Sequence, residues 1–286
     1  MFIKKHIPNL FTFLNLSSGL IGILFVLENQ LTIAAFMVLL GIFFDFFDGF
    51  FARILKVTSE LGKQLDSLAD IVTSGVVPGF IIFQLLKQST VAWSGNEVMS
   101  MLQVGNYLPF IGFIIPLASA YRLANFNIDE RQSSSFIGLP TPANALLIVS
   151  IPLIIAYSSN IEIVALIQQP FFLVTITLIG AILLNAEIPL FALKFKNYAL
   201  KENSIKYIFI LLIIILVSWL QFIAIPIVIL LYVILSIIER LKDSNIQILK
   251  DRRIVSQLHN SQLHNSQLHN FKLQRRFFFN SNDSPK

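Results

Sequence analysis

The sequence predicts an all-α membrane protein, a polytopic bundle of about eight transmembrane helices with both termini in the cytoplasm. Hydrophobic residues occupy 55% of the 286 positions, and the mean hydropathy is +0.74. Only 13% of the residues are charged, whereas a soluble domain carries roughly 25%. This composition leaves too little polar surface to cover a water-soluble globule, so it excludes both a soluble and a largely disordered protein.

The span count follows from the lengths of the apolar segments, because a helix needs about 20 apolar residues to cross the hydrocarbon core. The stretch 207–238 contains no charged residue and is too long for one span. We therefore divide it near Gln221 and Pro226, which favour a tight turn. The expected spans are residues 9–27, 32–51, 69–86, 107–121, 141–158, 170–186, 205–221 and 223–238.

The orientation follows from the placement of Lys and Arg, which concentrate on the cytoplasmic side of membrane proteins. With the N-terminus inside and eight spans, 20 of the 21 basic side chains fall on one face, and only Lys87 falls on the other. The sequence therefore predicts that both termini are cytoplasmic.

The chain divides into a membrane domain, residues 1–240, and a cytoplasmic tail, residues 241–286. Three copies of Ser-Gln-Leu-His-Asn fill positions 256–270, and a five-residue period fits neither a helix nor a strand, so we expect disorder. Residues 239–286 hold 9 basic and 4 acidic side chains. Next to a membrane, this excess of positive charge indicates contact with anionic lipid rather than with nucleic acid.

Four aspartates occur in two pairs, Asp45 with Asp48 and Asp66 with Asp70. Residues three or four positions apart share one helix face. Because the pairs lie near the ends of the second and third spans, joined by a short basic connection, we expect four carboxylates to converge at the cytoplasmic face. They would repel one another unless a cation neutralised them. Oxygen-only ligands and the absence of cysteine indicate a hard divalent ion, Mg²⁺ or Mn²⁺, as is typical of phosphate chemistry.

The residues between the acids are compatible with a phosphate ligand. Gly49 and Ala52 allow a bulky ligand to approach the helix, and Arg53 can hydrogen-bond a phosphate. We expect Gly62 to permit a tight turn into the third span.

Two alternatives to this interpretation exist. The acids could form ion pairs with the bases of the connecting loop, or they could be the binding relay of a divalent-ion transporter. A transporter should place acids near the bilayer midplane with an outer exit, and the outer halves of these spans are almost free of ionisable groups. The loop bases are Arg53, Lys56 and Lys63.

The pattern D-x2-D-G-x2-A-R-x8-G-x3-D-x3-D, from Asp45 to Asp70, resembles the signature of the CDP-alcohol phosphatidyltransferase family at every fixed position. The resemblance implies a homodimeric helical bundle with a polar cavity facing the cytoplasm, in which an alcohol displaces CMP from a CDP-linked lipid. It further implies that Asp45 and Asp66 are ligands shared by two divalent metals, that Asp48 binds one metal and Asp70 the other, and that Asp70 is the catalytic base. The residues implied at the CDP-lipid site are Asn9, Thr12, Gly49, Ala52, Arg53, Ser59 and Gly62.

Two later segments resemble the bacterial and archaeal phosphatidylserine synthases of this family. They are residues 121–127, Tyr-Arg-Leu-Ala-Asn-Phe-Asn, and residues 136–143, Phe-Ile-Gly-Leu-Pro-Thr-Pro-Ala. The resemblance implies that CDP-diacylglycerol is the donor and L-serine the acceptor, with Arg122 and Asn125 at the acceptor site. Asn125 is a departure, because an Arg is common at that position. The resemblance also implies that the protein lies in a bacterial-type inner membrane, with its active site facing the cytoplasm. Transfer to glycerol 3-phosphate or to an inositol phosphate remains an open alternative.

Overall fold

The structure, a computed structural model, describes residues 2–57, 59–94, 107–129, 136–190 and 204–240. Two units can be distinguished, Met1–Ile237 and Ile238–Lys286, and the first of them contains the elements discussed below except residues 238–240 at the end of the last helix. The expected tail, residues 241–286 with its repeats, lies outside the described residues.

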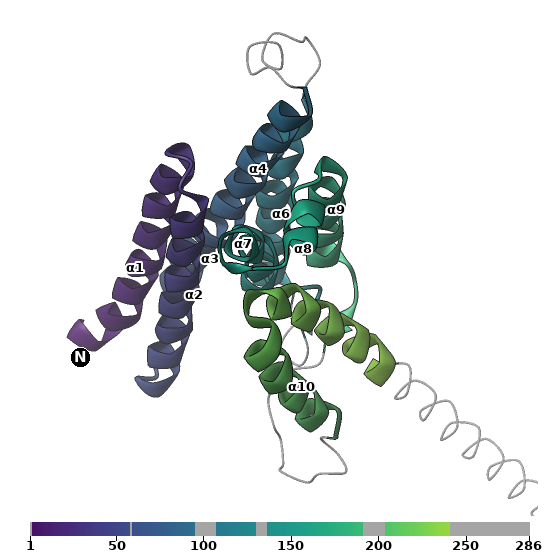
Figure 1. Cartoon of the computed structure of the whole chain (residues 1–286). Helices are drawn as coiled ribbons and strands as arrows, with labels where there is room; N and C mark the ends of the chain where they lie inside the picture. Colours follow the sequence, from purple (N-terminus) through teal and green to yellow (C-terminus); the bar gives the residue numbers. More distant parts are fainter. Residues whose placement is uncertain (1, 58, 95–106, 130–135, 191–203, 241–286) are drawn as a thin grey trace, which may run out of the picture. The chain divides into compact units, whose positions relative to one another are not determined.

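The described residues are almost entirely helical, which confirms the all-α class (Figure 1). The exception is a two-residue antiparallel pair of strands, in which Phe136 pairs with Leu190 and Ile137 with Pro189. In chain order the elements are α1 (Phe2–Leu27), α2 (Leu31–Ile54), α3 (Glu60–Asp70), the π-helix η1 (Ile71–Val76), α4 (Val77–Ser94), the 3₁₀-helix η2 (Leu108–Phe113), α6 (Ile114–Ile128), β1 (Phe136–Ile137), α7 (Thr141–Tyr157), α8 (Ile161–Ile167), α9 (Pro170–Asn185), β2 (Pro189–Leu190), α10 (Ser204–Leu220), the 3₁₀-turn η4 (Gln221–Ile223) and a helical stretch over 224–240.

By length and composition, five helices of the described chain can cross a membrane, and α8 with α9, bent by 66°, counts as a sixth span if taken as one. At 17 residues, α7 is a shorter apolar helix. The helix is interrupted at Gln221, whose φ of 49° begins η4, at the position of the expected turn, but Tyr207–Arg240 counts as one segment among the five. The count of eight spans and the placement of the termini remain predictions. The five long helical segments are His6–Leu27, Leu31–Ile54, Glu60–Ser89, Leu108–Ile128 and Tyr207–Arg240.

The third helical segment begins earlier than the expected residue 69. Ser59 caps α3, because its side chain accepts a hydrogen bond from the Gly62 backbone N–H at 3.0 Å. The expectation that Gly62 makes the turn into this segment is therefore wrong. Among the described residues of the connection, Lys56 is left-handed, with φ of 52°, and Gly62 lies inside the first helical turn. As a result, Asp66 lies within the helix rather than ahead of it.

The core is built around α7, which lies between the other helices (Figure 1). Most of its residues are buried, as expected for an apolar helix that packs against several others. Ile148 of α7 belongs to one buried cluster with Val38 of α2 and Ile81 of α4, and none of the three is exposed. α1 packs along α2 for most of its length. This packing fixes the positions of α2 and α3, the helices that carry the aspartates.

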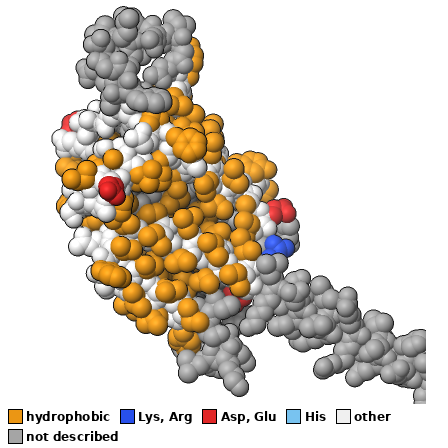
Figure 2. Space-filling view, turned by 45° about the vertical axis from the view of Figure 1, so that its right-hand side comes forward, with side chains coloured by type: hydrophobic (Ala, Val, Ile, Leu, Met, Phe, Trp, Pro, Cys, Tyr) orange, Lys and Arg blue, Asp and Glu red, His pale blue; other side chains and the backbone are white. Residues whose placement is uncertain are grey.

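The outer surface is apolar to a degree that water would not tolerate. Trp219 is 85% exposed and Phe171 is 82% exposed. Figure 2 shows a face covered mostly by hydrophobic side chains, with few charged groups among them. An integral membrane protein has such a surface, because lipid tails replace water around it.

Candidate active site

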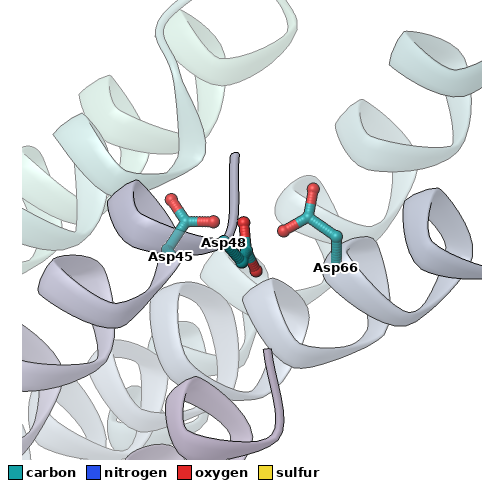
Figure 3. A group of neighbouring side chains, drawn as sticks. All are labelled: Asp45, Asp48 and Asp66. Carbon is teal, nitrogen blue, oxygen red and sulfur yellow. The ribbon is translucent and has the colours of Figure 1, made fainter. Parts of the chain in front are cut away.

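Three carboxylates from two helices meet at one point. Asp45 and Asp48 lie three residues apart on α2 and share a face, and Asp66 belongs to α3. One oxygen from each carboxylate lies within 4.8 Å of the others. Figure 3 shows the carboxylates of Asp45 and Asp66 pointing toward each other, with Asp48 between them. We call these three residues the aspartate cluster.

The aspartate cluster has the properties of a cation site. Asp48 is only 6% exposed, and its Oδ2 accepts a hydrogen bond from Thr12 Oγ1 at 2.7 Å. Asp66 Oδ1 is buried and has no hydrogen-bond partner within the described residues. Three carboxylates so close together repel one another, and a divalent cation with oxygen ligands would remove that repulsion.

Two of the three bases named for the neighbouring loop, Arg53 and Lys63, make other contacts. Arg53 Nε donates to the Gly49 backbone oxygen at 2.9 Å, one turn back on α2. Lys63 Nζ donates to the Asn127 backbone oxygen at 3.0 Å, which ties α3 to α6. These contacts do not support the alternative in which the loop bases neutralise the aspartates.

Asp70 lies one helical turn beyond Asp66 and outside the group of three. It is 8% exposed, and its Oδ1 accepts a hydrogen bond from Asn15 Nδ2 at 3.1 Å. It also interacts electrostatically with Asp66 and with Arg122. The expected convergence of four carboxylates is thus a tight group of three with a fourth beside it, and the metal-ligand role of Asp70 remains a prediction.

A π-helix follows Asp70 directly and connects it to α1. Thr73 Oγ1, in η1, donates to the Asn15 backbone oxygen at 3.0 Å. This contact fixes the backbone of Asn15, whose side chain donates to Asp70. Gly41 of α2 leaves room for this contact, since an added Cβ would meet Thr73 and lie 2.9 Å from Asn15 Oδ1. Sequence reasoning missed the contact between Asn15 and Asp70. The small residue at position 41 was the available signal.

The first cavity lies beside the aspartate cluster and has a volume of about 460 Å³. It is bounded by the start of α1, the end of α2 and the first turns of α3, and Asp48 and Asp66 line it. Arg53 does not line it in this structure. The other expected lipid-site residues do: Asn9, Thr12, Gly49, Ala52, Ser59 and Gly62.

The second cavity, of about 410 Å³, contains both expected acceptor residues, Arg122 and Asn125. Arg122 is 7% exposed, its Nη1 donates to Thr141 Oγ1 at 3.2 Å, and its guanidinium lies 5.8 Å from the Phe126 ring centroid. Its Nε has no hydrogen-bond partner within the described residues. The cavity also contains two acids that sequence reasoning missed, Asp129 and Glu187. No motif marked them: Asp129 follows the end of α6, the helix that carries Arg122, and the fold brings Glu187 from the segment after α9.

The comparison with protein families matches the part of the chain that carries this site. The family model described as CDP-alcohol phosphatidyltransferase matches residues 5–183. This range includes the whole aspartate cluster, the first cavity, and all lining residues of the second cavity except the last four. The chain belongs to the CDP-alcohol phosphatidyltransferase family.

Individual relatives match about half of this chain. It is 32% identical over 149 residues to the CDP-diacylglycerol–serine O-phosphatidyltransferase of Bacillus subtilis (strain 168), covering 51% of this chain and 74% of that protein. It is 34% identical over 148 residues to the protein of the same name from Helicobacter pylori (strain J99), covering 50% of this chain and 55% of the relative. It is also 32% identical over 154 residues to the archaetidylserine synthase of Methanothermobacter thermautotrophicus, covering 53% of this chain and 60% of the relative.

This family is generally dependent on divalent metals, and the residues present here fit such an ion. The cluster offers only oxygen ligands, it joins two helices, and one of its buried oxygens has no partner among the described residues. Hard cations such as Mg²⁺ and Mn²⁺ prefer this set of ligands.

Proposed function

We propose that this protein transfers the phosphatidyl group of CDP-diacylglycerol to the hydroxyl of L-serine and releases CMP. The observation that carries the proposal is the aspartate cluster beside the first cavity, built from the residues of the family signature. The serine acceptor is supported by the names of the relatives from Bacillus subtilis and Helicobacter pylori.

The first cavity suits the head group of a CDP-linked lipid. It combines small residues, Gly49 and Ala52, with polar ones, Asn9 and Ser59. A lipid substrate needs such a site at the membrane surface, because its acyl chains stay in the bilayer while its diphosphate is polar. In the proposal, Arg53 turns from Gly49 toward a phosphate oxygen, a contact open to an exposed guanidinium.

Asp45, Asp48 and Asp66 would hold the metal, with Asp70 completing the site for two divalent ions, Mg²⁺ or Mn²⁺. When bound, such ions neutralise negative charge on the diphosphate oxygens during transfer. Thr12 holds Asp48 in place through its 2.7 Å hydrogen bond, so we assign it to support of the cluster as well as to the lipid cavity.

Asp70 is the proposed general base. Its Oδ1 is held by Asn15, which leaves the other carboxylate oxygen to accept the proton of the serine hydroxyl. The serine oxygen then forms a bond to the phosphorus that carries diacylglycerol. The bond from that phosphorus to the bridging diphosphate oxygen breaks, and CMP leaves with the electron pair.

Serine would bind in the second cavity, with its carboxylate at Arg122 and Asn125 beside it. Arg122 is buried and has a free donor atom within the described part of the chain, as a carboxylate ligand requires. Its electrostatic interaction with Asp70 supports an acceptor hydroxyl close to the base.

The wider setting of the enzyme is also a proposal. The excess of basic residues on one predicted face supports an active site that faces the cytoplasm of a bacterial-type inner membrane. A homodimer is proposed from the family resemblance alone. The division into a membrane domain, residues 1–240, and a basic tail, residues 241–286, is retained as a proposal on composition.

The test is CMP release by the purified protein in detergent with CDP-diacylglycerol and Mg²⁺ or Mn²⁺. L-Serine, glycerol 3-phosphate and inositol 1-phosphate are compared as acceptors. We expect release that depends on serine. Release with only one of the phosphorylated acceptors would refute the serine assignment and leave the metal-dependent transfer standing, whereas no release with any acceptor would refute both.

A further inference from the structure

Polar contacts connect α3, which carries the proposed base, to α6, which carries Arg122. On α6, Asn127 Nδ2 donates to Ser67 Oγ at 2.9 Å. The Asn127 backbone oxygen accepts from Lys63 Nζ at 3.0 Å. Lys63 and Ser67 are four residues apart on α3 and therefore share one face of that helix. Asn127 is thus bound to α3 through its side chain and through its backbone.

The hydroxyl of Ser67 is held by a second contact. It donates to the Lys63 backbone oxygen at 3.2 Å. A hydroxyl has one donor and two acceptor positions, so Ser67 can make this bond and still accept from the Asn127 amide. The pair therefore has a consistent set of donors and acceptors, and the position of Ser67 Oγ is fixed on both sides.

The packing of the helices shows what this contact adds. α3 packs mainly on α1, whereas α6 packs on α9 and η1, and α3 touches α6 over only a short stretch. In η1, an added Cβ on Gly75 would lie 3.1 Å from Ser119 Cβ of α6. α6 therefore meets the continuous segment of α3 and η1 on both sides of Asp70. One contact, at Gly75, follows Asp70 in the chain, and the other, at Ser67, precedes it.

The groups proposed to act on the acceptor lie next to this contact. Asp70 follows Ser67 by three residues on the same side of α3, about 4.5 Å further along the helix axis. On α6, the buried Arg122 precedes Asn127 by five residues. A movement of α3 against α6 would change the separation of Asp70 from Arg122, and a misplacement of about 1 Å can reduce a reaction rate by about 10²-fold.

We propose that Asn127 is a positioning residue, which holds α6 against α3 through its bond to Ser67. The bond sets the distance between the acceptor residue Arg122 and the proposed base Asp70. This inference rests on the proposed function and adds a residue pair that the family signature does not contain, since position 67 is variable in the pattern from Asp45 to Asp70. It holds for whichever alcohol is the acceptor.

The test is a double-substitution cycle with Asn127→Ala, Ser67→Ala and the two combined. The backbone contact from Lys63 survives these substitutions, so the cycle isolates the side-chain bond. Steady-state CMP release is measured with CDP-diacylglycerol and L-serine, or with whichever acceptor supports release, and thermal unfolding is measured in detergent. Ser67→Thr is the conservative variant, because it keeps the hydroxyl.

The matched control is Asn160→Ala, outside both cavities. Asn160 caps α8, where its Oδ1 accepts from the Ile163 amide at 3.0 Å. Loss of this cap should lower thermal stability and leave the kinetics of CMP release unchanged. The control therefore shows what a loss of stability alone does to the kinetics.

We expect each single variant to lower kcat/KM for the acceptor by about 3- to 10-fold, the range of one neutral hydrogen bond. KM for CDP-diacylglycerol should stay unchanged, because neither Ser67 nor Asn127 lines the first cavity. The combined variant should lose no more than the weaker of the two single variants retains, since all three remove the same bond. Ser67→Thr should keep the kcat/KM of the unmodified protein.

Two results would overturn the inference and leave the proposed function standing. Losses that multiply in the combined variant would show that the two side chains act independently. Single variants that lower thermal stability but keep kcat/KM, as the control does, would show that the bond only stabilises the bundle. Absence of CMP release from the unmodified protein with every acceptor would refute the proposed function and the inference together.

Discussion

The hydrogen bond from Asn15 Nδ2 to Asp70 Oδ1 offers the sharpest test of the proposed base. The substitution Asn15→Leu removes the donor and keeps a side chain of similar size. Asn15 is completely buried, and its own Oδ1 has no partner in the described part of the chain, so the loss falls on the contact with Asp70. The backbone contact from Thr73 is made to the Asn15 carbonyl and survives the substitution.

The magnitude follows from the type of contact. A hydrogen bond to a charged group contributes about 1.5–3 kcal/mol, and about 1.4 kcal/mol corresponds to a factor of ten. If the bond orients Asp70 for proton transfer, kcat should fall by roughly 10- to 100-fold, while KM for CDP-diacylglycerol changes little. If the role of Asn15 were purely structural, the substitution would lower thermal stability without a selective fall in kcat.

The assay is steady-state CMP release with both substrates varied, accompanied by thermal unfolding in detergent. The control is Ser18→Ala on the same helix, where the hydroxyl donates to the Leu14 backbone oxygen at 2.9 Å. Asn15→Leu with kcat within twofold of the unmodified protein would refute the assignment of Asn15 as a positioning residue.

Three further predictions concern the same region. Removal of divalent ions with EDTA should abolish CMP release, Mg²⁺ or Mn²⁺ should restore it, and Asp66→Asn should raise the metal concentration needed for half-maximal activity; full activity in EDTA would contradict the metal site. Asp70→Asn should lower kcat by about 10²- to 10⁴-fold in a protein that still folds, as loss of a general base predicts, and near-normal turnover would exclude that role. Gly41→Ala should lower stability by about 1–3 kcal/mol through overpacking, measured against Gly49→Ala, where the nearest atom to the new Cβ is Arg53 Nη2 at 3.6 Å; equal melting temperatures would contradict the packing argument.

The sequence was sufficient to predict the aspartate cluster because its geometry is local. Asp45 and Asp48 share a helix face by spacing alone, and the short connection to α3 limits how far Asp66 can lie from them. The all-α class followed from composition in the same way. The expectation for Gly62 was wrong because the helix start was not recognised from the capping side chain of Ser59.

The rest of the site depends on contacts between distant segments. Asn15 and Asp70 are 55 positions apart, and Arg122 and Thr141 are 19 apart, so no periodicity could pair them. The π-helix after Asp70 was equally hidden, because the wider turn depends on how α3 and α4 pack against α1 and α6. Such insertions are frequent at functional sites, and here one begins at the residue after the proposed base.

The placement of Asp66 and Asp70 on one helix relates the two cavities to each other. Asp66 lines the first cavity, and Asp70 interacts with Arg122, which lines the second. The two aspartates are four residues apart, or about 6 Å along the helix axis. If the donor binds at Asp66 and the acceptor at Arg122, the proposed base lies one helical turn from the first of these residues and interacts electrostatically with the second.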